Sequence, residues 1–362
     1  MFTHNFGKTY YQVLYSRGIQ ETTMTKLEWE ELKLQPDPVY GRPIARSSHG
    51  LSVLRQGTLI FIYGGEHTAR TPIGQTVWQG DLLKGNWRAF QTANGAETSP
   101  CPRIAHAQAA HNDSVVYIFG GRTGVDMHET ALNDLWSYNI STNIWTEVQP
   151  KGGMPPEARS FHRMICVRDA LYVFGGCGSK GRLADWHKFD LATSVWETLV
   201  PSTLRGRGGP NLSILGTDQL LVWAGFAGEE TNDGQIFDLS TGEWKNLDSQ
   251  TQSIRPRSVC VAGTLSNGNV IIFGGEVNPS DRGHEGAGGF CQDVLVIKPG
   301  GNVSQPQFVQ GNELTTVSKV LPCARGWSAG DTAGNSLYLF GGLTGDDTNP
   351  SRLSDLWKLT VS

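Results

Sequence analysis

The chain has 362 residues, a formal net charge of -4 at pH 7 and 45 glycines, and 38% of its residues are hydrophobic. This charge balance gives no reason to expect nucleic acid or an anionic membrane as a partner. No apolar stretch in the sequence approaches the length of a membrane span. The many glycines favour short strands joined by tight turns.

Residues 1–24 are expected to form an N-terminal extension without fixed structure. They lack the continuous apolar core of a secretory signal. Lys8 and Arg17 with no acidic residue before position 21 leave a transit peptide as the alternative interpretation. The cysteines are scattered without a CxxC pair, which favours reduced thiols and a cytoplasmic location.

A pair of small residues recurs along the chain, each time after a short apolar run such as VYIF or LYVF. The pairs are Gly64-Gly65, Gly120-Gly121, Gly175-Gly176, Ala224-Gly225, Gly274-Gly275 and Gly341-Gly342. A period of roughly 50 residues with a strand-like run, a glycine pair and a later tryptophan is the signature of a kelch repeat. Six copies predict an all-β fold, a six-bladed kelch β-propeller over residues 25–362.

Each repeat is expected to supply four antiparallel strands, a to d, to one blade. In the second repeat, strands a to c are predicted near residues 104–109, 116–119 and 135–138, and strand d opens at Trp145. In the fifth repeat, which lacks the tryptophan, residues 307–309 are expected to fill strand d. The last repeat ends after three strands, and residues 27–30 can supply the fourth. We therefore expect the N-terminal strand to close the last blade, which removes two open sheet edges.

The d–a loops and the b–c loops are expected at one mouth of the central channel, because consecutive antiparallel strands reverse direction. Each d–a loop carries an arginine at the same register. These arginines are Arg46, Arg103, Arg159, Arg207, Arg257 and Arg325. Six guanidiniums around the mouth predict a positive funnel that binds a sulfate, phosphate or carboxylate group. The alternative is structural, with each arginine bonded to loop carbonyls or to acids of the next blade.

Two residues after each arginine, Phe161 and Trp327 stand out as bulky aromatics among smaller residues. We expect them to form the wall of an apolar pocket beside the cations. Ordinary packing beneath the loops is the alternative interpretation.

The b–c loop after Gly275 holds candidate metal ligands. Glu276, Asp281 and His284 lie within nine residues on a glycine-rich loop. One imidazole and two carboxylates suit Fe(II), Mn(II) or Zn(II) with positions open for substrate. The equivalent loops of the first two repeats carry the rival ligands Glu66, His67, Asp126, His128 and Glu129. An acid-rich surface loop that binds no metal is the alternative.

Several stretches of the chain share one further pattern. They are ARSSHG at 45–50 with IYGGE at 62–66, PEARSFH at 156–162, GRGG at 206–209, PRSV with IIFGGEV at 256–277, and ARGW at 324–327. Together they resemble the plant specifier proteins, which are the epithiospecifier, nitrile-specifier and thiocyanate-forming proteins of glucosinolate breakdown. The resemblance covers nearly the whole chain from about residue 25, and its most specific piece is GGEVxPxxxGHxGxG.

The resemblance implies a lyase-like activity that depends on non-haem Fe(II). The substrate would be a thiohydroximate O-sulfate, an unstable aglucone released by a thioglucosidase and directed to nitrile-type products instead of isothiocyanate. By position, Arg103 matches the arginine that holds the sulfate. Phe161 and Trp327 match aromatic pocket residues, and Glu276 and His284 match the outer two iron ligands.

The middle iron ligand of the family departs from the pattern in this chain. Ser280 stands at that position, and the nearest acid, Asp281, is one residue later. Asn278 is a fallback oxygen donor for the metal.

Three functions follow from the sequence. The first is the iron-dependent specifier-type reaction on a small anionic sulfur compound. The second is a non-enzymatic kelch scaffold that binds a protein partner at the same mouth, because fold alone does not dictate function. The third is another kelch enzyme, either a sugar-acid epimerase or a copper radical oxidase, although neither a secretory signal nor a Tyr/Cys/His copper set is found. Metal content separates the first two, since a scaffold is not expected to retain iron.

Overall fold

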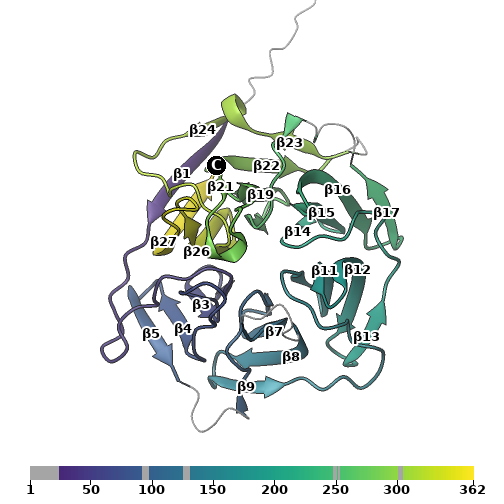
Figure 1. Cartoon of the computed structure of the whole chain (residues 1–362), viewed down its shortest axis with the longest axis horizontal. Coiled ribbons are helices and arrows are strands. Elements are labelled where there is room, and N and C mark those ends of the chain that lie inside the picture. Colours follow the sequence, from purple (N-terminus) through teal and green to yellow (C-terminus); the bar gives the residue numbers. More distant parts are fainter. Residues whose placement is uncertain (1–23, 92–97, 125–130, 248–250, 252, 301–304) are drawn as a thin grey trace, which may run out of the picture.

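A computed structural model describes residues 24–91, 98–124, 131–247, 251, 253–300 and 305–362. The extension predicted over residues 1–24 therefore lies, apart from Met24, outside the described residues. Six main sheets are arranged around a central axis (Figure 1). Five of them contain four strands in chain order, and the sixth also contains β1 and β24 from earlier in the chain. The predicted all-β, six-bladed propeller is confirmed.

The first three blades follow the predicted order of four strands. Blade 1 contains β2 (Gly50–Leu54), β3 (Leu59–Tyr63), β4 (Val77–Asp81) and β5 (Asn86–Phe90). Blade 2 contains β6 (Ala107–His111), β7 (Val115–Arg122), β8 (Ala131–Asn139) and β9 (Ile144–Glu147). Blade 3 contains β10 (Arg163–Val167), β11 (Ala170–Gly178), β12 (Gly181–Asp190) and β13 (Val195–Thr198).

The last three blades hold the irregular elements. Blade 4 contains β14 (Asn211–Leu215), β15 (Gln219–Phe226), β16 (Glu230–Asp238) and β17 (Glu243–Asn246). Blade 5 contains β18 (Val261–Thr264), β19 (Val270–Phe273), β22 (Val294–Lys298) and β23 (Gln307–Val309). The b–c loop of blade 5 contains β20 (Glu276–Asn278), the 3-10 turn η3 (Gly283–Glu285) and β21 (Gly289–Phe290). Blade 6 contains β25 (Ala329–Ala333), β26 (Ser336–Thr344), β27 (Ser351–Val361) and β1 (Thr25–Glu31). The 3-10 turn η4 (Gly311–Glu313) leads into β24 (Leu314–Thr316).

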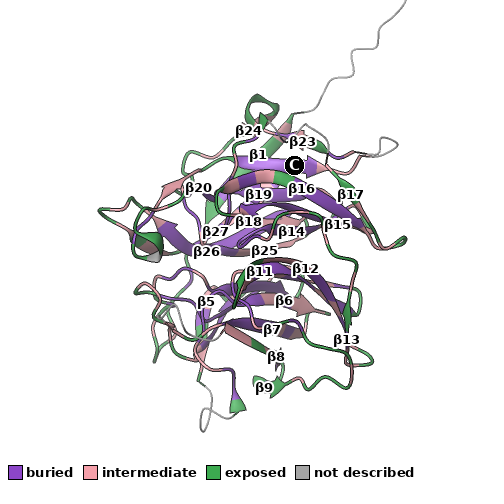
Figure 2. Ribbon diagram, turned by 45° about the vertical axis from the view of Figure 1, so that its right-hand side comes forward, coloured by how far each residue is buried: buried purple, intermediate pink, exposed green. Residues whose placement is uncertain are grey.

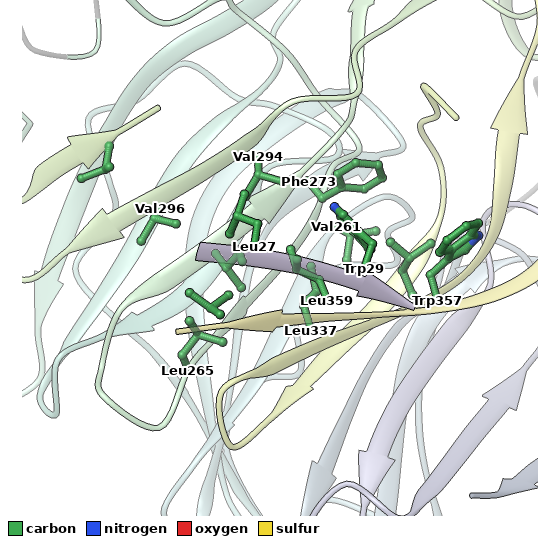
Figure 3. Close-up of a cluster of buried hydrophobic side chains, with 14 residues drawn as sticks. Leu27, Trp29, Val261, Leu265, Phe273, Val294, Val296, Leu337, Trp357 and Leu359 are labelled. Carbon is green, nitrogen blue, oxygen red and sulfur yellow. The ribbon is translucent and has the colours of Figure 1, made fainter. Parts of the chain in front are cut away.

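The N-terminal strand closes the last blade, as the sequence predicts. β1 pairs antiparallel with β27, from Leu27 opposite Val361 to Glu31 opposite Trp357. The short strand β24 pairs with β1 in parallel and adds a fifth strand that the sequence analysis did not anticipate. Leu27 and Trp29 point from β1 into the core between blades 5 and 6 (Figure 3).

The hydrophobic core lies between the faces of neighbouring sheets, and exposed residues concentrate in the loops and the outer strands (Figure 2). The strand-d tryptophan fills this space, as expected for a large apolar side chain. Trp145 of blade 2 meets Tyr63 of blade 1 with ring centroids 5.0 Å apart. Within the described residues, no helix is long and apolar enough to cross a membrane.

A closed circle of backbone hydrogen bonds ties the six blades together at one mouth of the channel. It joins the residues that lie two positions after each d–a loop arginine. Each of their N–H groups donates to the carbonyl oxygen of the corresponding residue in a neighbouring blade, at 2.8–3.1 Å. The members are Ser48, Ala105, Phe161, Gly209, Val259 and Trp327. All have a positive φ, between 47° and 58°, a conformation that costs a non-glycine residue about 1–2 kcal/mol. Because of this turn, strand a of blade 2 begins at Ala107, a few residues after the predicted start.

Three histidines lie directly beneath this circle. His49, His106 and His162 are buried, and each ring meets the edge or face of the aromatic residue that precedes a glycine pair, as His106 meets Tyr63 at 5.8 Å between centroids. Burial lowers the pKa of all three, with nearby arginines adding to the effect, and the pKa of His106 falls to about 3. The native protein therefore holds them neutral.

The neutral state of His106 predicts a pH-dependent contribution to stability. Below the unfolded pKa of about 6.5, the unfolded chain binds a proton that the native chain does not, so the free energy of unfolding falls as pH decreases. A His106→Phe variant keeps a ring against Tyr63 but cannot titrate. Denaturant unfolding from pH 7 to pH 4.5 should show wild type losing about 1.4 kcal/mol per pH unit relative to the variant. A pH-independent difference between the two proteins would contradict this assignment. The carboxylates and the other histidines titrate in both proteins, so their effects cancel in the comparison.

Candidate functional site

The six arginines of the d–a loops do not form the open positive funnel predicted from the sequence. Each side chain is at most 2% exposed, and each donates from Nη1 to the carbonyl oxygen of the first residue of a Gly-Gly or Ala-Gly pair. These are Arg46, Arg103, Arg159, Arg207, Arg257 and Arg325. The structural alternative describes them correctly, because a buried guanidinium bonded to backbone carbonyls cannot present itself to a ligand in the channel.

Five of these arginines are also neutralised by an aspartate at the start of strand c. Arg103 donates two hydrogen bonds of 2.7 Å to the carboxylate of Asp134, a bidentate geometry. The other partners are Asp185 for Arg159, Asp233 for Arg207, Asp293 for Arg257 and Asp355 for Arg325. The pKa of each aspartate is lowered by its arginine against the opposing effect of burial. Arg103 is therefore part of a buried ion pair and does not contact the cavity described below.

Arg46 in blade 1 is the exception. Thr76 occupies the position that aspartate holds in the other blades. Trp78 pairs with Ile62 in blade 1 as Trp136 pairs with Ile118 in blade 2, and Thr76 precedes Trp78 by two residues just as Asp134 precedes Trp136. Arg46 still donates to the carbonyl oxygens of Gly64 and Ile44 at 3.0 and 3.1 Å. Burial lowers its pKa to about 10, so it stays charged at neutral pH.

A different ring of residues lines the mouth. The residue directly after each Gly-Gly or Ala-Gly pair forms a backbone bridge with the residue after the d–a loop arginine. The six are Glu66, Arg122, Cys177, Phe226, Glu276 and Leu343. All six line one cavity of about 360 Å³, a volume within the range of small-molecule sites. The side chains available to a ligand therefore come from the b–c loops and not from the arginine register.

Phe161 and Trp327 form the floor of this cavity. They come from blades 3 and 6, which face each other across the ring, and their ring centroids lie 5.4 Å apart in an edge-to-face arrangement. The structure thus brings together the two aromatics that the sequence analysis singled out. They separate the mouth cavity from a second cavity of about 410 Å³, which the first strands of the blades line at the other end of the channel.

Three arginines that the sequence analysis did not single out line the cavity, namely Arg70, Arg122 and Arg182. The guanidinium of Arg122 lies 5.6 Å from the ring centroid of Phe161, and that of Arg182 lies 4.5 Å from the ring centroid of Phe226. The Nε of Arg122 is buried and makes no hydrogen bond within the described part of the chain. Neither Arg122 nor Arg182 forms an ion pair with a described residue. A guanidinium that lies over an aromatic ring keeps N–H groups available to an anion.

Two glutamates lie at the blade-4 and blade-5 side of the mouth, and one of them, Glu276, lines the cavity. Glu276 is buried, and burial together with the nearby Glu230 raises its pKa to about 8. Burial raises the pKa of Glu230 to about 7, although the Ser258 hydroxyl, 3.2 Å from its Oε1, opposes the shift. The Oε2 of Glu230 is buried and makes no hydrogen bond to a described residue. Burial therefore disfavours the charged form of both carboxyl groups, and Glu230 adds to this effect at Glu276.

Glu66, a rival metal ligand in the sequence analysis, is already bonded within the protein. Its carboxylate accepts hydrogen bonds from the hydroxyls of Ser47 and Ser48 and from the backbone N–H of Arg70. Arg352 lies 3.6 Å from it. His67 is exposed, and its Nδ1 lies 2.8 Å from the carbonyl oxygen of Ala45. The rivals Asp126, His128 and Glu129 lie outside the described residues.

The predicted metal triad is placed only in part. Glu276 lies inside the cavity, whereas Asp281 is exposed and its backbone N–H donates to Asp347. The side chain of His284 lies outside the described part of the chain. Among the described residues, no three His, Cys, Asp or Glu side chains come close enough to hold a metal ion. The iron triad therefore stays a prediction.

Comparison with known proteins gives the family. The family model of the KLHDC2/KLHL20/DRC7 kelch-repeats domain matches residues 50–275, more than half of the chain. The chain is a kelch-repeat protein. A solved structure described as that of YjhT aligns with this kelch propeller at a TM-score of 0.66 and 18% identity, covering 89% of this chain and 98% of the other, which shows a shared fold.

Curated relatives of this kelch protein are distant. A protein of Thlaspi arvense named N-(sulfonatooxy)prop-2-enimidothioate sulfolyase is 26% identical over 75% of this chain and 80% of its own length. Human kelch domain-containing protein 1 is 25% identical over 55% of this chain, and Adagio protein 3 of Arabidopsis thaliana is 26% identical over 92% of it. The matched region spans about half the length of each of the last two proteins. The resemblance to specifier proteins is thus supported by the sulfolyase.

The sequence contained a signal for the residues that were missed. Arg122, like Glu66 and Glu276, directly follows a glycine pair, and these positions share one register in every kelch repeat. Arg182 carries no such mark, because it reaches the cavity from the start of strand c, which lengthens toward the mouth in blade 3.

Proposed function

We propose that this kelch propeller binds a small organic anion in the mouth cavity and directs the breakdown of a thiohydroximate O-sulfate to nitrile-type products. One observation carries the proposal: Arg122 lies over Phe161 and Arg182 over Phe226 in a cavity of about 360 Å³, and neither of these two arginines forms an ion pair with a described residue. The name of the Thlaspi arvense relative, a sulfolyase of an N-sulfonatooxy imidothioate, supplies the reaction class.

The two arginines suit a sulfate leaving group. A guanidinium donates two parallel hydrogen bonds to sulfate oxygens, and the aromatic face beneath fixes its plane. In the step to a nitrile, the N–O bond breaks with its electron pair going to the sulfate, which leaves as the dianion, while the C–S bond breaks and the thiolate sulfur leaves as zero-valent sulfur. Cations already in position stabilise the second negative charge on the sulfate in the transition state. Phe161 and Trp327 would pack against the organic side chain and exclude water from the bond that breaks.

Fe(II) remains part of the proposal as the cofactor predicted from the resemblance. Of the predicted triad, Glu276 lines the cavity, and the side chain of His284 lies outside the described residues. Asp281 is exposed, and no described group of three donors is assembled. The iron triad therefore stays a prediction from the resemblance, and we derive no step through the metal.

The product spectrum of a glucosinolate treated with a thioglucosidase and Fe(II) tests the proposal. With the protein present, gas chromatography and mass spectrometry should show a shift from isothiocyanate to nitrile. A Glu276→Gln variant should lose this shift while its melting temperature stays close to that of wild type, because glutamine keeps the shape of the side chain and burial already disfavours the charged form of Glu276. An unchanged spectrum with folded wild-type protein and added iron would contradict the proposed reaction.

A protein partner at the same mouth is the second candidate function. The rim around the cavity carries exposed charged side chains, including Arg182, Glu229 and Arg282, and a polar rim around an apolar centre is the usual layout of a protein interface. The matched family model and human kelch domain-containing protein 1 are compatible with a scaffold of this kind. For either function we propose the cytoplasm as the compartment, since all six cysteines are free.

A further inference from the structure

We propose that the channel beneath the mouth cavity holds a second ligand site, in which the guanidinium of Arg163 binds a small oxyanion. The site lies in the lower cavity, which is the cavity of about 410 Å³ lined by the first strands of the blades. The aromatic floor of Phe161 and Trp327 separates it from the mouth cavity. The proposed function uses only the mouth cavity, so this inference does not depend on it.

The first argument is the position of the Arg163 side chain. Arg163 begins β10, the first strand of blade 3, and lines both the lower cavity and the small space directly beneath the aromatic floor. Its Nε donates to the carbonyl oxygen of Pro210 at 2.8 Å, and its Nη2 donates to that of Cys260 at 3.1 Å. These two residues directly precede β14 of blade 4 and β18 of blade 5. The guanidinium therefore reaches from blade 3 past blade 4 to blade 5, inside the channel.

The other blades carry uncharged residues at the register of Arg163, four positions after each d–a loop arginine. These residues, all of which line the lower cavity, are Gly50, Ala107, Asn211, Val261 and Ala329. Glycine and alanine leave space in the channel beside the long side chain of Arg163. Arg163 is therefore a charged residue at a level of the channel where the other five blades contribute no charge.

The second argument is that Arg163 has no counter-charge in the described part of the chain. Burial lowers its pKa, and no carboxylate acts against that shift. His106 and His162, which share the space beneath the floor, are held neutral, and Arg163 itself helps to lower the pKa of His162. Five of the d–a loop arginines, in contrast, each hold an aspartate. A cation taken out of water without a partner is unfavourable, and a bound anion supplies that partner.

The acidic residues among those that line the lower cavity do not supply the counter-charge. They are Asp113 and Asp331. Asp113 is exposed in the turn between β6 and β7. Asp331 accepts hydrogen bonds from the backbone N–H groups of Val53 and Thr332 at 2.9 and 2.8 Å, and Arg163 does not contribute to the pKa shift of its carboxyl group. Neither aspartate therefore neutralises Arg163.

The third argument is that Arg163 keeps N–H groups for a ligand. A guanidinium has five N–H donors, and the two bonds to carbonyl oxygens use two of them. Its Nη1 donates to no described residue. Oxygens of a sulfate, phosphate or carboxylate group suit these donors, because a guanidinium binds oxyanions through parallel hydrogen bonds. Arg46 also lacks a carboxylate partner, but it lines neither the mouth cavity nor the lower cavity, so it offers no comparable site.

Calorimetric titration with sodium sulfate, sodium phosphate and sodium acetate, at constant ionic strength set with sodium chloride, tests the inference. The Arg122→Gln, Arg182→Gln double variant is the starting protein, because it lacks two mouth arginines that would bind the same probes. At least one oxyanion should bind it with a Kd on the order of 1 mM or below. Adding Arg163→Gln should weaken this binding about tenfold or more. Adding Arg168→Gln, which removes an exposed arginine of the same blade, should leave it unchanged.

The probe that binds most tightly shows whether the ligand is a tetrahedral oxyanion or a carboxylate. No binding of any of the three probes to the folded double variant would overturn the inference, as would binding that survives Arg163→Gln. Because Arg163→Gln removes two bonds between blades, crystals of the wild-type protein soaked in selenate give a second readout that needs no variant. They should show an anomalous peak within hydrogen-bonding distance of Nη1 of Arg163, and its absence there would contradict the site. Both readouts are independent of the glucosinolate assay.

Discussion

Asp134→Asn is expected to lower the free energy of unfolding by about 3 kcal/mol. The change keeps the shape of the side chain but leaves the Arg103 guanidinium, which is 0% exposed, without its counter-charge. Removing one partner of a buried ion pair costs more than the pair contributes, because the other charge stays in a low-dielectric environment. Urea denaturation of the variant and wild type at pH 7 measures the difference.

Two matched variants sharpen this prediction. Asp233→Asn should cost less, because the Asp233 side chain is 51% exposed whereas that of Asp134 is 25% exposed, and water screens the exposed pair. Thr76→Asp should raise stability by on the order of 1 kcal/mol, because it supplies Arg46 with the aspartate that the other blades have. If Asp134→Asn proves neutral and Thr76→Asp destabilises, the arginines are not held by these pairs.

Trp29→Ala is expected to cost about 3–5 kcal/mol, the usual loss for a large buried aromatic side chain. Trp29 is 7% exposed and meets Phe273 of blade 5 at 4.8 Å and Trp357 of blade 6 at 6.4 Å between ring centroids. Its loss opens a cavity at the seam where the chain ends meet. Thermal or urea unfolding measures the effect.

Glu28→Ala is the matched control for the closing strand, because Glu28 is exposed on the same strand β1. Its effect should stay within about 0.5 kcal/mol. If the two variants lose the same small amount of stability, β1 does not close the ring in solution. A large loss confined to Trp29→Ala supports closure through the buried face of the strand.

The fold could be predicted from the sequence because every blade repeats one set of local signals. The glycine pairs need positive φ, and the apolar runs before them form the buried second strands. β1 was predictable because the last repeat lacks one strand. β24 was not, because its three residues pair in parallel with β1 and carry no repeat signal.

The candidate site was predicted less completely, for a physical reason. Phe161 and Trp327 were predicted because they are the bulky aromatics at the position two residues after the d–a loop arginine. That position forms the circle of backbone hydrogen bonds at the mouth of the channel. Arg103 is unavailable to a ligand because it is paired with Asp134, a residue about 30 positions away that the arginine pattern alone does not reveal. An aspartate precedes the strand-c core in five of the six repeats, so the pairing could have been read from the sequence had both positions been compared.

The most direct test of the account is the product spectrum of the glucosinolate assay with the Arg122→Gln, Arg182→Gln double variant. The account assigns binding of the substrate anion to these two side chains on the mouth cavity and not to the buried arginine ring. It predicts that the double variant loses the shift to nitrile while keeping the wild-type melting temperature, and that Arg168→Gln behaves as wild type. A full shift to nitrile by the double variant would contradict it.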